Sequence, residues 1–144
     1  MIEGNPAREE LKRIDHLIHV TLKYTRTVDV IRSIIEKFLL ALDKGIGHHY
    51  DLRYDAGKIK SIPTAPLMRL RQLEESYPKD PMVKDLFDFY MGLRQTYNAE
   101  YKAKEEYRKN VALVTKEKEV NIPMLREYQE KTKAFIEYLE QVTR

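Results

Sequence analysis

The sequence predicts an all-α fold, an elongated up-down helical bundle that forms one domain over residues 1–144. Two observations predict it. Apolar residues recur three or four positions apart over most of the chain, which places them on one face of a helix. A polar residue followed by proline, at residues 5–6 and 80–81, marks two helix starts. We expect two long helices, one short helix and one C-terminal helix, with a small β-hairpin or ordered arm at 45–66.

Composition narrows the classes of function. The 144 residues contain no cysteine, which excludes a disulfide framework, a thiolate metal site and a cysteine nucleophile. The formal net charge is only +3, and 34% of the residues are charged, with Lys, Glu and Arg dominating as in thermophile proteins. No apolar run is long enough to cross a bilayer, and the order of a signal peptide is missing. We therefore expect a cytoplasmic protein.

The first long helix is predicted from Asn5 to Gly45. Asn5 can accept a backbone N–H at the helix start, and Pro6 suits the first helical position. Gly45 is the residue type that commonly ends a helix, with Lys44 at the negative end of the helix dipole. Such a helix would be roughly 60 Å long. The apolar residues of its stripe are Leu11, Ile14, Leu17, Ile18, Leu22, Val28, Ile31, Ile34, Ile35, Phe38, Leu39 and Leu42.

The arm at 45–66 is the one stretch that does not read as helix. Tyr50, Leu52 and Tyr54 alternate with charged residues, and residues 55–58 have the composition of a turn. These features indicate a short β-hairpin. Two isolated strands are marginally stable in water, so the hairpin would need support from the bundle or a partner chain.

Three more helices complete the predicted bundle. A short helix should run from about Ala65 to Tyr77, and a second long helix should open at Asp80 and continue in coiled-coil-like spacing through Val114. A third amphipathic helix follows Pro123. Because this helix is shorter than the two long ones, part of their apolar surface should remain uncovered, and we expect a homodimer to cover it.

The histidines form two clusters. His16 and His19 lie one turn apart, and Asp15 precedes His19 by four positions, so an acid–base pair or a set of metal ligands could form there. His48 and His49 fall in the arm. The chain contains no Glu-x-x-His motif of the kind that di-metal bundles use. Solvated polar surfaces explain both clusters more simply, and we expect no metal and no cofactor.

A basic stretch with interleaved aromatic residues is the most specific sign of a partner. No acidic residue lies between Asp55 and Glu74. Basic side chains beside aromatic ones can hold phosphates and stack on unpaired bases, which favours single-stranded nucleic acid. The alternative is an ordinary solvated face. The candidate binding residues are Tyr50, Arg53, Tyr54, Lys58, Lys60, Arg69 and Arg71.

The segment from Arg13 to His19 resembles the Arg-x4-6-His signature of the HEPN family of helical-bundle ribonucleases and nucleotidyltransferase partners. The resemblance covers seven residues near the N-terminus, whereas the family motif lies in later helices. Ile14 stands where the family usually has a polar residue. The resemblance implies that Arg13 and His19 would act on RNA at a dimer cleft.

The function expected from the sequence is a non-enzymatic, self-associating binding or scaffolding module with a macromolecular partner. The chain has no Gly-rich phosphate loop, no nucleophile elbow and no His-Glu metal signature. The alternative is a HEPN-like RNA-binding or RNA-cleaving bundle that uses Arg13, His19 and the basic stretch 53–71. No membrane partner is expected.

Overall fold

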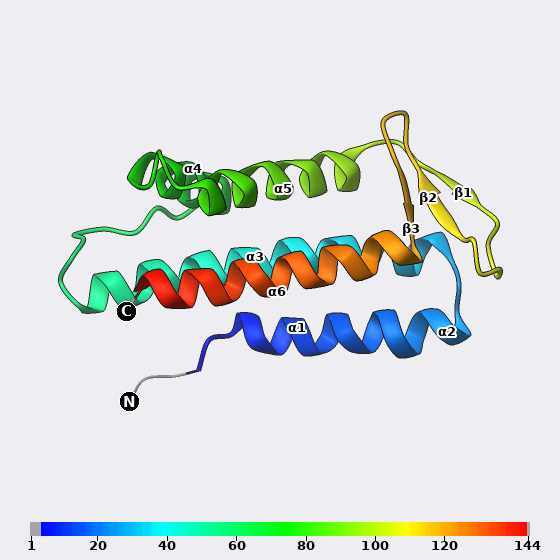
Figure 1. The fold of residues 1–144 in the computed structure, drawn as a ribbon, viewed down its shortest axis with the longest axis horizontal. Helices are drawn as coiled ribbons and strands as arrows, with labels where there is room; N and C mark the ends of the chain where they lie inside the picture. The colour runs from blue at the N-terminus through cyan, green and yellow to red at the C-terminus, as the bar shows by residue number, and fades with distance from the viewer. Residues whose placement is uncertain (1–3, 144) are drawn as a thin grey trace.

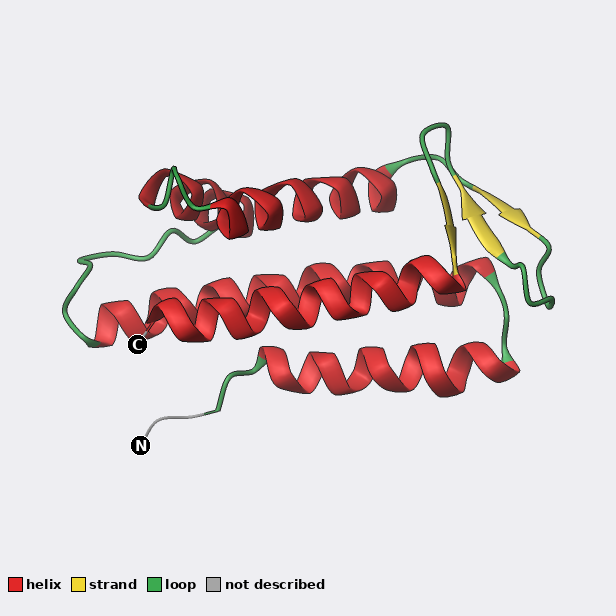
Figure 2. Cartoon of the chain, in the orientation of Figure 1, coloured by secondary structure: helices red, strands yellow, loops and turns green. Residues whose placement is uncertain are grey.

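The computed structural model describes residues 4–143 and is mostly helical, with one small antiparallel sheet (Figures 1 and 2). None of the described helices combines the length and the apolar character that a membrane crossing requires. In chain order the elements are α1 (Ala7–His16), the π-helical turn η1 (Leu17–Thr21), α2 (Leu22–Tyr24), α3 (Val28–Asp55), α4 (Pro66–Ser76), α5 (Pro81–Asn98), β1 (Lys102–Lys104), β2 (Ala112–Val114), β3 (Glu119–Asn121) and α6 (Ile122–Thr143).

Helix α3 lies at the centre of the molecule and packs against α1, α4, α5 and α6. Figure 1 shows α6 beside α3 and running in the same direction, whereas α1 and α5 run the opposite way on either side. The largest fully buried side chains of α3 are Phe38, Ile31, Ile34, Ile35, Leu42 and Ile46. The sheet closes one end of this bundle, and α4 lies at the other. We call these the sheet end and the α4 end.

The prediction of one continuous helix over residues 5–45 was wrong. The helix breaks between α2 and α3, at Thr25 to Thr27, and the chain folds back so that the apolar stripes of α1 and α3 bury each other. Thr27 makes the break favourable because its hydroxyl accepts the backbone N–H of Val30 at 3.4 Å and caps α3. A straight helix would have left both stripes exposed to water.

Gly45 does not end a helix, and the predicted arm at 45–66 is not a hairpin. Gly45 is buried in the middle of α3, where an added Cβ would lie 3.4 Å from Ile136 and 3.7 Å from the Cβ of Ala7. The missing side chain lets α1, α3 and α6 approach closely. Helix α3 instead ends after Asp55, where Gly57 adopts a φ of +73° that suits glycine.

The second long helix was predicted to continue through Val114, but α5 ends at Asn98 and a three-stranded sheet follows. The strands pair in the order β1-β2-β3, with Ala103 opposite Leu113 and Leu113 opposite Val120. Residues 111–113 are buried in succession, which a strand lying against α3 permits and a single helical face does not.

The short helix, the start at Asp80 and the C-terminal helix were predicted close to their observed positions. Asp80 accepts the N–H of Met82 at 2.9 Å, and Asn121 accepts the N–H of Met124 at 3.0 Å. The predicted role of Asn5 is also seen, since its side chain accepts the N–H of Ala7 at 3.0 Å.

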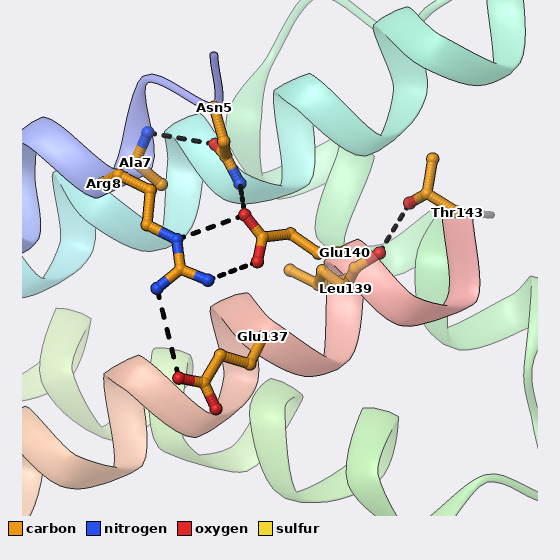
Figure 3. A network of polar contacts seen from close by, with 7 residues as sticks. All are labelled: Asn5, Ala7, Arg8, Glu137, Leu139, Glu140 and Thr143. Carbon is orange, nitrogen blue, oxygen red and sulfur yellow. Dashed lines mark hydrogen bonds and ion pairs between the residues drawn. The ribbon is translucent and has the colours of Figure 1, made fainter.

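Two ends of the described chain are joined by a polar network (Figure 3). The carboxylate of Glu140 on α6 accepts hydrogen bonds from Asn5 at 3.1 Å and from Arg8 Nε at 3.2 Å. These bonds hold the start of α1 against the last turns of α6.

Candidate binding surface

Three residues of the predicted basic stretch serve the structure of the α4 end. Tyr50 is buried, and its hydroxyl donates to the carbonyl of Arg69 at 3.3 Å. Arg53 donates to the hydroxyl of Tyr77 at 2.8 Å. Arg69 donates through Nε to the carbonyl of Pro63 at 2.6 Å and through Nη2 to that of Thr64 at 3.2 Å. Arg69 thus holds the loop at 56–65, and Tyr50 and Arg53 join α3 to α4 and to the residue that follows it.

The other four residues of that stretch are exposed. Tyr54 is 50% exposed on the last turns of α3, Lys58 and Lys60 lie in the loop, and Arg71 lies on α4. Among the described residues, none of the three cations forms an ion pair with a carboxylate. Four of the seven predicted binding residues are therefore exposed.

The second histidine cluster lies in α3 and not in a flexible arm. His49 is only 2% exposed, its Nδ1 lies 2.6 Å from the hydroxyl of Thr143, and its ring contacts Tyr50 and Tyr77 edge-on. Burial, with smaller contributions from the charges of Arg53 and His48, lowers the pKa of His49 to about 4. Within residues 4–143, no three His, Asp or Glu side chains are grouped to hold a metal ion.

Arg13 and His19 bind to different helices. Arg13 pairs with the buried carboxylate of Glu10, which also accepts from Lys44 of α3 at 2.9 Å. Burial acts to raise the pKa of Glu10, but the hydrogen bond and charge of Lys44 and the charge of Arg13 lower it overall. His19 instead lies 3.2 Å from the amide oxygen of Gln129 on α6.

The side chain of Gln129 contacts both His19 and Asp15, the carboxylate that the sequence places one turn before this histidine. Its amide nitrogen donates to Asp15 at 2.8 Å, so its oxygen faces His19 Nε2. The contact lies in η1, and π-helical turns are frequent at functional sites. Arg13 takes no part in it, so the two residues of the HEPN-like segment are not brought to one centre.

A large groove lies at the sheet end. A groove of about 890 Å³ separates the end of α5 from the sheet. It adjoins a cavity of about 350 Å³ between α5 and α6, and the two share Thr96 and Lys118. The groove is lined by Gln95, Thr96, Ala99, Glu100, Tyr101, Lys102, Val114, Thr115, Lys116, Glu117 and Lys118.

The loop between β1 and β2, residues 105–111, is fastened to the break between α2 and α3. Glu106 accepts the N–H of Val28 at 2.9 Å, which caps the first turn of α3, and the N–H of Tyr107 donates to the carbonyl of Arg26 at 2.7 Å. Figure 1 shows this loop beside the α2–α3 connection. Two hydrogen bonds therefore hold the loop against the α2–α3 break.

The fastened loop displays an aromatic side chain. Tyr107 is 76% exposed and adopts a φ of +68°, a conformation that is unusual for a bulky residue. Tyr24 is 79% exposed and lies two residues before Arg26, to which the loop is bonded. These two rings are the most exposed of the large apolar side chains in the described chain. We call Tyr24, Tyr107 and the cations around them the tip.

Cations outnumber carboxylates at the tip. Lys23, Lys102, Arg108 and Lys109 are exposed and form no ion pair among the described residues, whereas Lys104 pairs with Glu119. The exposed carboxylates nearest in sequence are Asp29, Glu100 and Glu105, because Glu106 is used as a cap. Sequence reasoning missed the tip because it assigned residues 101–114 to a helix.

Comparisons of this chain with protein-family models, with curated proteins and with solved structures found no match.

Proposed function

We propose that this protein is a non-enzymatic binding module that holds a macromolecular partner at its sheet end. The observation that supports this role most directly is the groove of about 890 Å³ between α5 and the sheet. It adjoins the fully exposed strand β1, which leads from the groove to the tip. A partner lying across this end would contact the groove, β1 and the tip together.

The positions of the perturbed ionisable groups also support binding over catalysis. Burial raises the pKa of Tyr50 to about 12, and burial together with the hydrogen bond to Asp43 raises that of Tyr90. These groups and His49 lie inside the bundle, where each is held by a structural contact, and none of them lines the groove. A catalytic site would require such groups to meet a substrate.

Site-specific photo-crosslinking tests the binding role. A photoreactive phenylalanine derivative is introduced at Lys116 in the groove and, as a control, at Tyr54 on the α4 end, since both positions are exposed. Irradiation in cells should give adducts from position 116 in clear excess over position 54. Equal or absent adducts would contradict the proposal.

RNA cleavage by Arg13 and His19 has less support. Their bonds to Glu10 and to Gln129 hold them toward different helices. Binding through the basic stretch 53–71 is likewise weakened because Arg53 and Arg69 are used within the α4 end.

Self-association remains part of the proposal, but its basis has changed. The expected uncovered stripe on the long helices is largely covered by α6, whose Leu125, Phe135, Ile136 and Leu139 are buried. Among the described residues, large apolar side chains are exposed outside the tip at Val20, Tyr54, Met68 and Tyr101. A homodimer would have twice the mass of one 17.2 kDa chain in sedimentation equilibrium. A mass that stays at one chain over a wide concentration range would exclude the dimer.

A further inference from the structure

We propose that the partner is single-stranded nucleic acid, with unpaired bases stacking on Tyr24 and Tyr107 and the backbone following β1. This assignment rests on the proposed binding role and names the class of its partner. The tip lies at the opposite end of the molecule from the basic stretch 53–71.

The aromatic geometry supports stacking. Bases stack on exposed aromatic rings irrespective of sequence, and a ring held by a rigid backbone loses little entropy when it binds. Two hydrogen bonds join the loop to the α2–α3 break. The N–H of Tyr107 donates to the carbonyl of Arg26, and the carboxylate of Glu106 accepts the N–H of Val28. The exposed ring of Tyr107 is thus presented by a backbone that hydrogen bonds hold against the bundle.

The charge distribution identifies the class of occupant. A second copy of this chain or an apolar peptide would favour a ring of mixed charges, but the unpaired cations here are Lys23, Lys102, Arg108 and Lys109. A strand of phosphates complements them, because these four cations outnumber the nearby exposed carboxylates Asp29, Glu100 and Glu105. Stacking rings with interleaved free cations are the combination that grips single strands.

The exposed edge of the sheet indicates the path that the nucleic-acid strand would take. β1 is an edge strand whose three residues are all exposed, and Lys102 stands where β1 meets the groove. Tyr101, next to it, is also exposed and lines the groove. A nucleic-acid strand lying along β1 would therefore meet aromatic rings at both ends of β1. It would meet phosphate-binding cations between these rings and beyond them.

Fluorescence anisotropy of labelled U12 and dT12, titrated with the full chain at two salt concentrations, tests the assignment. We expect saturable binding of at least one oligonucleotide that weakens steeply as salt rises. Tyr107→Asn, which retains the positive φ, and Tyr24→Ala should each weaken binding roughly tenfold, because each removes one stacking ring. Tyr54→Ala removes an exposed ring from the α4 end and should change affinity less than twofold.

Two triple variants, each of which removes three positive charges, distinguish binding at the tip from binding at the α4 end. Replacing Lys23, Arg108 and Lys109 by Gln should reduce the slope of log affinity against log salt by about 2. The matched replacement of Lys58, Lys60 and Arg71 by Gln should leave the slope nearly unchanged.

Several outcomes would overturn the assignment. These are absence of oligonucleotide binding at low salt, a larger effect of the α4-end triple variant, or tip variants that halve the mass in solution without changing anisotropy. The last result would identify the tip as a dimer contact. If the groove crosslinks a protein while both oligonucleotides fail to bind, only the nucleic-acid assignment fails, and the proposed binding role stands.

Discussion

The two ends of the molecule contain similar residues and use them in opposite ways. At the α4 end, Arg53 and Arg69 donate to a tyrosine hydroxyl and to backbone carbonyls, and Tyr50 is buried. At the sheet end, Tyr107 and Arg108 extend from a loop whose N–H groups at 107, 108 and 111 donate to backbone carbonyls, and the loop's own carboxylate, Glu106, caps α3. Local density of arginine and tyrosine therefore does not predict a binding surface by itself.

The difference arises from which groups form hydrogen bonds with the backbone of each loop. The loop at 56–65 has no regular structure, so its carbonyls need donors, and the nearest arginine supplies them. The loop at 105–111 instead bonds within itself, Arg108 N to Glu105 and Val111 N to Arg108, and to the α2–α3 break. Among the described residues, Arg108 and Lys109 of this loop form no ion pair.

The largest expected effect is on the pH dependence of stability, and it tests whether the buried side chains at the α4 end are shielded from water. The pKa of His49 is lowered to about 4 in the folded chain, so the unfolded chain takes up this proton first as pH falls. Stability should be complete above the usual histidine pKa of about 6.5 and should fall by roughly 3 kcal/mol between pH 7 and pH 4. Urea unfolding of the wild type and His49→Gln over this range measures it.

The variant should lose this part of the pH dependence, and His16→Gln, at an exposed position, should retain it. Identical pH profiles for wild type and His49→Gln would show that the histidine is hydrated and that the α4 end is open.

Arg69→Ala tests the structural use of arginine at the α4 end. The change removes two hydrogen bonds from a charged donor to the loop and should lower the free energy of unfolding by roughly 2 kcal/mol. Amide hydrogen exchange within 56–65 should accelerate. Arg71→Ala is the matched control on the exposed side of α4 and should stay within about 0.5 kcal/mol of wild type. Equal losses of stability in Arg69→Ala and Arg71→Ala would show that the hydrogen bonds of Arg69 do not stabilise the α4 end.

Glu106→Ala tests the fastening of the sheet end. Loss of the cap on Val28 should cost about 1 kcal/mol and should increase hydrogen exchange at the first turn of α3. Glu105→Ala changes the neighbouring carboxylate, for which no bond to the bundle is seen among the described residues, and should have little effect on unfolding by urea. A destabilisation of the same size in both variants would indicate a general charge effect instead of a cap.

The smallest effect has the opposite sign. Tyr107 occupies a left-handed conformation that asparagine tolerates better, so Tyr107→Asn should raise the free energy of unfolding by about 0.5 kcal/mol. Tyr107→Val places a β-branched residue there and should destabilise the chain. Thermal unfolding of the two variants measures the contrast. A loss of stability in Tyr107→Asn would mean that the ring contributes to packing, contrary to its exposure.

Local chemistry in the sequence predicted several elements correctly. The starts at Asp80 and Asn121 rest on side chains that bond to an amide only two or three residues away, and such contacts are visible in sequence. Gly45 misled the prediction because a helical glycine can serve either as a terminator or as a site of close helix packing. Only the position of α6 decides between them.

The sheet and the tip could not be predicted in this way. Tyr101, Tyr107, Val111 and Val114 lie at spacings that fit a helix, although tyrosine and valine also favour strands. The positive φ of Tyr107 depends on a bond to Arg26, a residue distant in sequence, and no glycine marks the position. The contacts of His49 and Gln129 likewise depend on α6 and leave no local trace.

The pairing of the first and last helices has a consequence for biosynthesis. Asn5 and Glu140 are bonded across 135 positions, and α6 covers a large part of the buried face of α3. On the ribosome, α6 is the last of these elements to be made, so α1 and α3 emerge with much of their shared apolar surface still open to water. The contacts of α6 with α1 and α3 can therefore form only after residues 122–143 have been translated, so the core is completed after these last helical residues are made.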